Sequence, residues 1–174
     1  RFSMIIAIPS AVGLAVLAAP ISNLLFPGRD NTDLIKMTCY GSSAVVVYSL
    51  STVTNAVLQG INRMKTPIRN AGISLVLHTV ILFVMLRYLH MGIYGVLYAN
   101  ILFALFICIL NARSIARFKR YRQEVKKTFL IPMVASAVMG AAAFGVYRAA
   151  YSVFGNLIST GISVFVAMLV YFVL

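Results

Sequence analysis

Charged residues are scarce in this chain, and acidic residues are almost absent. Only 10% of its 174 residues are charged, with three Asp or Glu against 15 Lys or Arg, while 61% are apolar. A soluble domain mixes short apolar stretches with polar faces, whereas the apolar residues here come in long runs. The composition therefore argues against an ordinary soluble globular domain.

The few acids and cysteines also exclude several kinds of site. Asp30, Asp33 and Glu124 lie in polar connections, so the apolar runs lack the carboxylate that usually anchors proton or sodium coupling inside a membrane. Cys39 and Cys108 lie in different runs, without a metal-ligand or redox spacing. We expect no disulfide, metal site, cofactor or catalytic constellation, and hence no enzyme.

Six apolar runs approach the length of a membrane crossing, which takes about 20 helical residues for a hydrocarbon core of about 30 Å. Spans should be helical, because open strands leave backbone groups unpaired in lipid. The sequence thus predicts an all-α, polytopic transmembrane bundle. Its predicted spans are 2–26, 34–58, 68–88, 92–110, 129–147 and 157–174.

The connections suggest an organisation in three parts. Residues 1–111 form a four-helix part, 112–128 a basic cytoplasmic connector, and 129–174 a terminal helix pair that we expect to be truncated. The chain starts directly in an apolar run without the features of a signal peptide. We expect it to be a C-terminal piece of a longer membrane protein.

Basic residues predict the orientation. The net charge of +12 sits in the connections rather than on a nucleic-acid-binding surface, so we expect no nucleic acid partner. Cytoplasmic loops carry the excess of Lys and Arg, and the connector at 112–128 is either such a topology signal or a segment that binds anionic lipid. Eleven basic residues then face the cytoplasm: Arg1, Arg63, Lys65, Arg69, Arg113, Arg117, Lys119, Arg120, Arg122, Lys126 and Lys127. Arg29, Lys36, Arg87 and Arg148 face the other side.

Polar side chains recur at helical spacing in the second and third spans. They either line a hydrated cavity or hydrogen-bond between packed spans, and the sequence leaves both interpretations open. His78 is either a packing residue or a proton carrier. The candidate cavity residues are Ser42, Ser49, Thr52, Asn55 and Gln59 in the second span, with Thr38 on the same face, and Asn70, Ser74 and His78 in the third. The candidate hinges are Pro9, Pro20, Gly60 and Pro67.

Two segments carry a family resemblance. The first span reads IAIPSAVGLAVLAAPISNLLFPG, and the turn after the second reads NAVLQGINRMKTPIRNAGISLVLH. Together they resemble the polysaccharide-exporter branch of the multidrug/oligosaccharidyl-lipid/polysaccharide flippase superfamily, in particular the stage V sporulation protein B group and the O-antigen and lipid II flippases. In the turn, Leu58, Gln59, Gly60 and Pro67 match the family pattern. Asn62 stands where many relatives have Gly, and Asn also accepts a left-handed backbone.

The resemblance implies a second lobe, built like that of the multidrug and toxin extrusion transporters, plus an accessory helix pair. The whole protein would be a fourteen-helix flippase in the bacterial cytoplasmic membrane. It would move a lipid-linked oligosaccharide or peptidoglycan precursor of the undecaprenyl-pyrophosphate type through a cationic cavity by alternating access. Its partners would be membrane lipids and the N-terminal lobe of the same chain.

Two alternatives stay open. The first is a multidrug or cation efflux antiporter of the same superfamily, which would need a buried acid in the other half of the protein. The second is a membrane enzyme or subunit of polysaccharide assembly, which would need His, Asp or Glu clusters at a membrane face.

Overall fold

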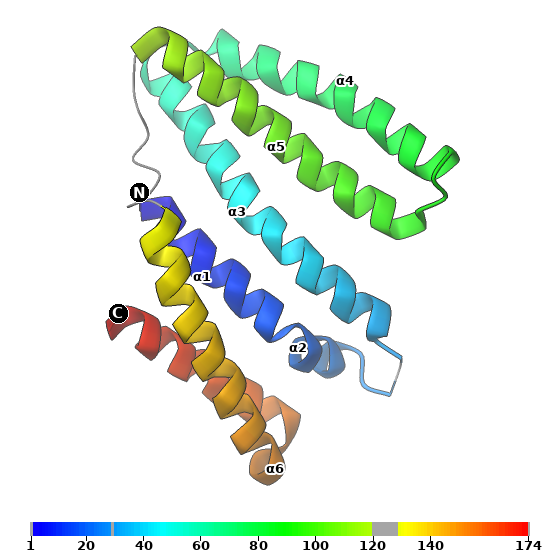
Figure 1. Cartoon of the computed structure of the whole chain (residues 1–174), viewed down its shortest axis with the longest axis vertical. Helices are drawn as coiled ribbons and strands as arrows, with labels where there is room; N and C mark the ends of the chain where they lie inside the picture. The colour runs from blue at the N-terminus through cyan, green and yellow to red at the C-terminus, as the bar shows by residue number, and fades with distance from the viewer. Residues whose placement is uncertain (1, 29, 120–128, 174) are drawn as a thin grey trace. The chain divides into compact units, whose positions relative to one another are not determined.

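The computed structural model describes residues 2–28, 30–119 and 129–173. These residues form helices joined by short connections, which confirms the predicted all-α class (Figure 1). Five helices are long and apolar enough to cross a membrane, or six if one bent pair counts as a single span. The elements are α1 (Phe2–Val16), α2 (Ala18–Leu25), α3 (Thr32–Gly60), α4 (Lys65–Arg87), α5 (Gly92–Lys119) and α6 (Ile131–Val173).

The first predicted span is not one straight helix, because α1 and α2 meet at Leu17 with a bend of 66°. Pro20 lacks the N–H that would bond to the carbonyl of Val16, and its ring crowds that carbonyl. The helix therefore breaks one turn before Pro20. Pro9, by contrast, lies inside a continuous α1.

The turn between α3 and α4 contains a residue in a left-handed conformation, which Asn accepts. Asn62 is left-handed, with φ of 59°, and its N–H bonds to the carbonyl of Gln59 at 2.9 Å. The N–H of Arg63 reaches the carbonyl of Leu58 at 3.0 Å, so the two bonds form a Schellman motif. Gly60 is the last residue of α3. Pro67 lies in the first turn of α4, where no helical bond is lost.

The fourth predicted span ends too early. Residues 112–119 continue α5 instead of opening a connector, while 120–128 lie outside the described residues. Ile107, Asn111 and Ile115 are buried one turn apart, so the packed face of the helix runs past Leu110. The change of composition at Asn111 marks a change of polarity and not the end of the helix.

The terminal pair is joined more tightly than predicted. The predicted spans 129–147 and 157–174 leave a connection between them, but helix continues on both sides of Gly155. This residue has φ of 72° and ψ of −178°, a conformation open essentially to glycine alone, and it divides α6 into membrane-length segments Ile131–Ser152 and Gly155–Val173.

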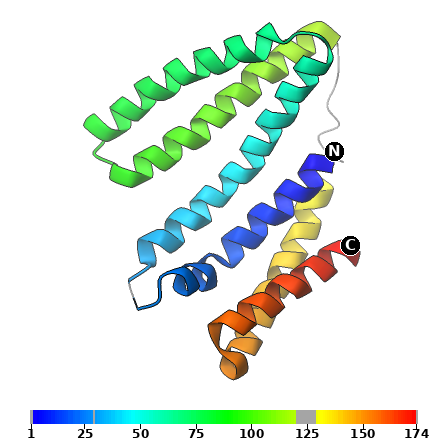
Figure 2. The ribbon, with the colours of Figure 1, turned by 180° about the vertical axis from the view of Figure 1, so that it is seen from behind.

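The helices divide into two compact units. The first unit comprises Arg1–Ser42 and Val125–Leu174, and in it α1 and α2 pack with α6 (Figure 2). The second unit is Ser43–Glu124, with most of α3 and all of α4 and α5. Gly140 of α6 favours the close packing of α1 against α6, since its missing side chain leaves room for Val12 of α1.

The connection from α2 to α3 is held by two polar side chains. Asn31 is buried, and its Nδ2 donates to the carbonyl of Phe26 at 2.8 Å. The carboxylate of Asp30 accepts bonds from the hydroxyl and the N–H of Thr32, at 2.6 and 3.1 Å, and these bonds lower the pKa of Asp30. They hold the chain at the first turn of α3.

Candidate functional site

A cluster of polar side chains joins α3, α4 and α5 in the second unit. Asn111 of α5 is fully buried at its centre. Its Nδ2 donates to Oδ1 of Asn55 at 2.6 Å and to Oγ1 of Thr54 at 3.2 Å, both on α3. Its Oδ1 accepts from Nδ2 of Asn70 on α4 at 2.9 Å, and Asn70 also donates to Oγ of Ser114 at 3.3 Å. A continuous set of hydrogen bonds thus spans three helices.

The polar residues predicted on the third span face α5. Asn70 is 3% exposed and Ser74 is fully buried, so these two residues serve helix packing in this unit. His78 lies one turn further on and is half-buried against Phe103, with ring centroids 5.4 Å apart. Among the described residues, Oγ of Ser74 and Nε2 of His78 are buried without a hydrogen-bond partner.

The polar stripe predicted on the second span divides between two faces of α3. Thr52 and Gln59 are exposed, and Ser49 is partly exposed, as is Asn55 beside the cluster. The hydroxyl of Thr52 bonds to the carbonyl of Tyr48 in its own helix. Ser42 is buried instead, with its hydroxyl on the carbonyl of Cys39, and Thr38 is partly exposed. Thr52 and Gln59 are therefore exposed polar residues two helical turns apart on α3, with Gln59 in its last turn.

A basic groove of about 440 Å³ opens between the start of α4 and the end of α5. It lies next to the polar cluster, because Asn70 and Ser114 belong to both. The remaining lining residues are Arg69, Ile73, Leu110, Arg113, Ala116 and Arg117.

The first unit holds a groove of different character, with a volume of about 600 Å³ between α1 and α6. Its lining is almost entirely apolar and includes Pro9 and Gly13 of α1 and Met139, Ala167 and Met168 of α6. The hydroxyl of Tyr171 at its edge bonds to the carbonyl of Ile5 at 2.7 Å. This groove suits a hydrocarbon chain rather than a polar ligand.

Three residues of the polar cluster, Thr54, Asn111 and Ser114, were not predicted from the sequence as candidate site residues. Thr54 was passed over because it falls beside the predicted stripe, although it is buried and bonded. Asn111 was placed at the end of the four-helix part and Ser114 in the connector at 112–128. Their spacing from the buried Ile107 and Ile115 continues one helical face, which is the signal that would have kept them in the span.

The described part of the chain contains no group of three or more His, Cys, Asp or Glu side chains arranged to hold a metal ion. Comparisons with protein-family models, with curated proteins and with solved structures found no match to this chain.

Proposed function

We propose that the protein is a flippase that moves a lipid-linked oligosaccharide or peptidoglycan precursor across the membrane by alternating access. The observation that carries this proposal is the polar face of α3. Thr52 and Gln59 are exposed on a helix of membrane length. Polar side chains at membrane depth face protein or a water-filled cavity, because facing lipid is costly. The uncovered face of α3 therefore suits the wall of a hydrated route.

The chemistry of the chain favours an anionic cargo with a hydrocarbon tail. The described residues of the second unit contain seven basic side chains and no acidic one. This balance suits a pyrophosphate-sugar head group better than a cation. The apolar lining of the groove between α1 and α6 suits a hydrocarbon chain such as a polyprenyl tail.

The test is depletion of the full-length protein in the cells that make it, followed by extraction of lipid-linked intermediates. A flippase predicts that precursors accumulate on the side of synthesis. Complementation with Thr52→Leu and Gln59→Leu together should fail to restore the pools, because the pair removes the polar face. Val76→Leu is the matched control, since Val76 is 66% exposed on an apolar part of α4.

The other outcomes of the depletion experiment favour different functions. Normal precursor pools after depletion would overturn the flippase proposal and favour an efflux antiporter. A precursor that is chemically incomplete, rather than merely misplaced, would favour an enzyme or subunit of assembly. Full activity of the Thr52→Leu and Gln59→Leu double variant would show that α3 does not line the route.

A further inference from the structure

Three arginines converge on the basic groove of the second unit. Arg69 lies on α4, while Arg113 and Arg117 lie one turn apart on α5. The two helices are antiparallel neighbours joined by a tight turn, so the start of α4 lies beside the end of α5 (Figure 1). Arg69 is only four residues into α4, about 6 Å along its axis. The arginines thus ring one end of a pair of membrane-length helices.

No acidic residue balances the positive charge of this groove among the described residues of its unit. Across residues 43–119 the chain has no Asp or Glu. Within the described part of the chain, Arg69, Arg113 and Arg117 make no ion pair, and all three are exposed. Guanidinium groups bind phosphate through paired N–H donors, so three free ones around a groove favour a phosphorylated ligand.

The remaining lining of the groove includes aliphatic side chains. Ile73 and Leu110 border the groove on the side away from the helix ends, and Ile73 is 46% exposed. On α4 the exposed face continues from Ile73 to Leu77, which is 40% exposed. A ligand that places a phosphate among the arginines would therefore lay its tail on aliphatic side chains.

A buried polar residue of the groove is held in place by hydrogen bonds. Asn70 is 3% exposed and is held by hydrogen bonds to Asn111 and Ser114, both on α5. These bonds fix the two helices to each other at the level of the arginines. The groove is therefore a formed feature of the α4–α5 pair and not only a set of flexible surface charges.

From this geometry we infer that the groove between α4 and α5 binds the phosphate of an anionic glycerophospholipid, with an acyl chain on Ile73 and Leu110. Basic pockets between membrane helices at the cytoplasmic side are suited to anionic lipid head groups. The residues that line the groove lie on α4 and α5 and include neither Thr52 nor Gln59, so occupancy of this site is measured without any transport assay. It would tie the α4–α5 pair to an anionic leaflet.

The test measures lipid binding to purified full-length protein in detergent, using phosphatidylglycerol as the probe. Native mass spectrometry counts bound lipid, and phosphatidylcholine serves as the zwitterionic comparison. We expect the Arg113→Gln and Arg117→Gln double variant to weaken phosphatidylglycerol binding about thirtyfold, since each of the two basic side chains near an anionic head group contributes about 1 kcal/mol. Arg113→Lys with Arg117→Lys retains the charge and should lose less.

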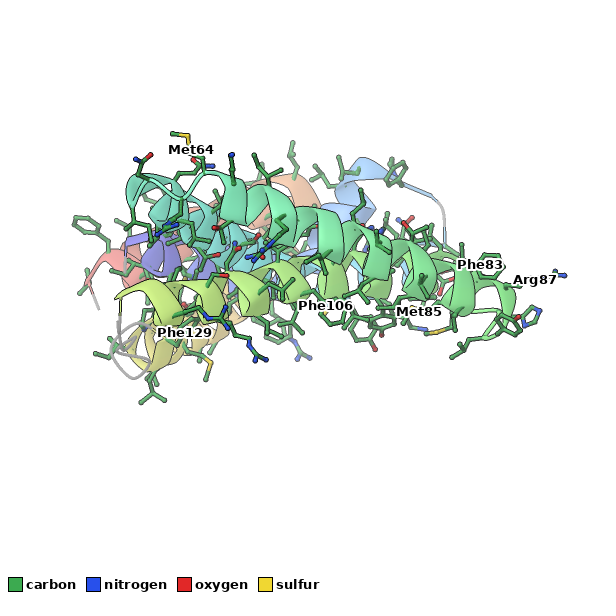
Figure 3. All side chains as sticks on the ribbon, turned by 90° about the horizontal axis from the view of Figure 1, so that it is seen from above. Met64, Phe83, Met85, Arg87, Phe106 and Phe129 are labelled. Carbon is green, nitrogen blue, oxygen red and sulfur yellow. The ribbon has the colours of Figure 1, made fainter. Side chains whose placement is uncertain are left out.

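Arg87→Gln with Arg148→Gln is the matched control, because both arginines are exposed and lie outside the groove. Figure 3 shows Arg87 reaching outward from the far end of α4. An equal loss in this control would reduce the effect to general surface charge and overturn the site. Equal binding of phosphatidylcholine would overturn it too, as would displacement of the lipid by millimolar inorganic phosphate, which would make the ligand a free anion.

Discussion

Asn70 and Asn111 are joined across α4 and α5 by a hydrogen bond of 2.9 Å, from Nδ2 of the first to Oδ1 of the second. Asn111 carries the connection on to Asn55 of α3. Lipid tails are as apolar as leucine, so burial from water does not drive membrane helices together. Polar contacts and close packing do so instead, which gives a single buried amide an unusual share in holding α3, α4 and α5.

Replacing Asn111 with Leu should destabilise the second unit by about 2 kcal/mol. The change removes three hydrogen bonds and leaves buried polar atoms of Asn70 and Thr54 without this partner. The measurement is the midpoint of unfolding in mixed micelles under increasing denaturing detergent. Thr52→Val is the control, since the hydroxyl of Thr52 is exposed and bonds only within α3. A midpoint for Asn111→Leu no lower than the control's would contradict the role of the cluster.

Gly140 sets the distance between α1 and α6. A Cβ at this position would lie 2.8 Å from Cγ1 of Val12 and 3.3 Å from Cγ2 of Val16. Gly140→Ala should therefore push the helices apart and cost about 1–3 kcal/mol. The midpoint of unfolding in mixed micelles under increasing denaturing detergent measures this loss of stability.

The control for Gly140→Ala lies on the same helix. Gly145 has nothing within 4 Å of an added Cβ, so Gly145→Ala should leave the stability unchanged or raise it slightly. Adding Val12→Ala to Gly140→Ala should recover most of the loss. If Gly140→Ala behaves like Gly145→Ala, close packing at this point is not what pairs α1 with α6.

Run length predicted six spans, and the described residues contain five helices long and apolar enough to cross a membrane, or six if the bent pair α1–α2 counts as one span. The ends of the spans were less predictable. The run that breaks at Leu17 is uninterrupted in hydropathy, and the bend comes from Pro20 acting on the preceding turn. The end of α5 was missed for the opposite reason, since a helix that leaves the apolar region continues with Arg113 and Arg117 on its surface.

The partners of each helix were not predictable in the same way. A stripe of polar residues at steps of three and four fixes one face of a helix but does not say what covers it. Thr54 and Asn55 are adjacent in the sequence, and both meet Asn111 at the border between the buried and exposed faces of α3. At Gly140 of α6 an added Cβ would lie 2.8 Å from Val12 of α1, and a close approach of this kind leaves no mark in a hydropathy pattern.

Asn62 should tolerate glycine but not a β-branched residue. Its φ of 59° places it in the left-handed region, where ordinary L-residues are strained by about 1–2 kcal/mol. Asn62→Gly should keep the stability of the protein, and Asn62→Val should lower it by that amount. Met64→Val is the control, because Met64 has φ of −56° and is 62% exposed. Equal effects of the two valine substitutions would show that the Schellman motif does not depend on this residue.

The two ends of α4 provide a test of orientation within one helix. Lys65 begins the helix and Arg87 ends it, and both are exposed. Because the more basic side should face the cytoplasm, Lys65→Cys should resist a membrane-impermeant thiol reagent in intact cells and react after permeabilisation. Arg87→Cys should react in intact cells. The exposed Cys39 is first replaced with Ser to remove its background signal. The reverse pattern would invert the orientation, and equal labelling of both positions in intact cells would show that α4 does not cross the membrane.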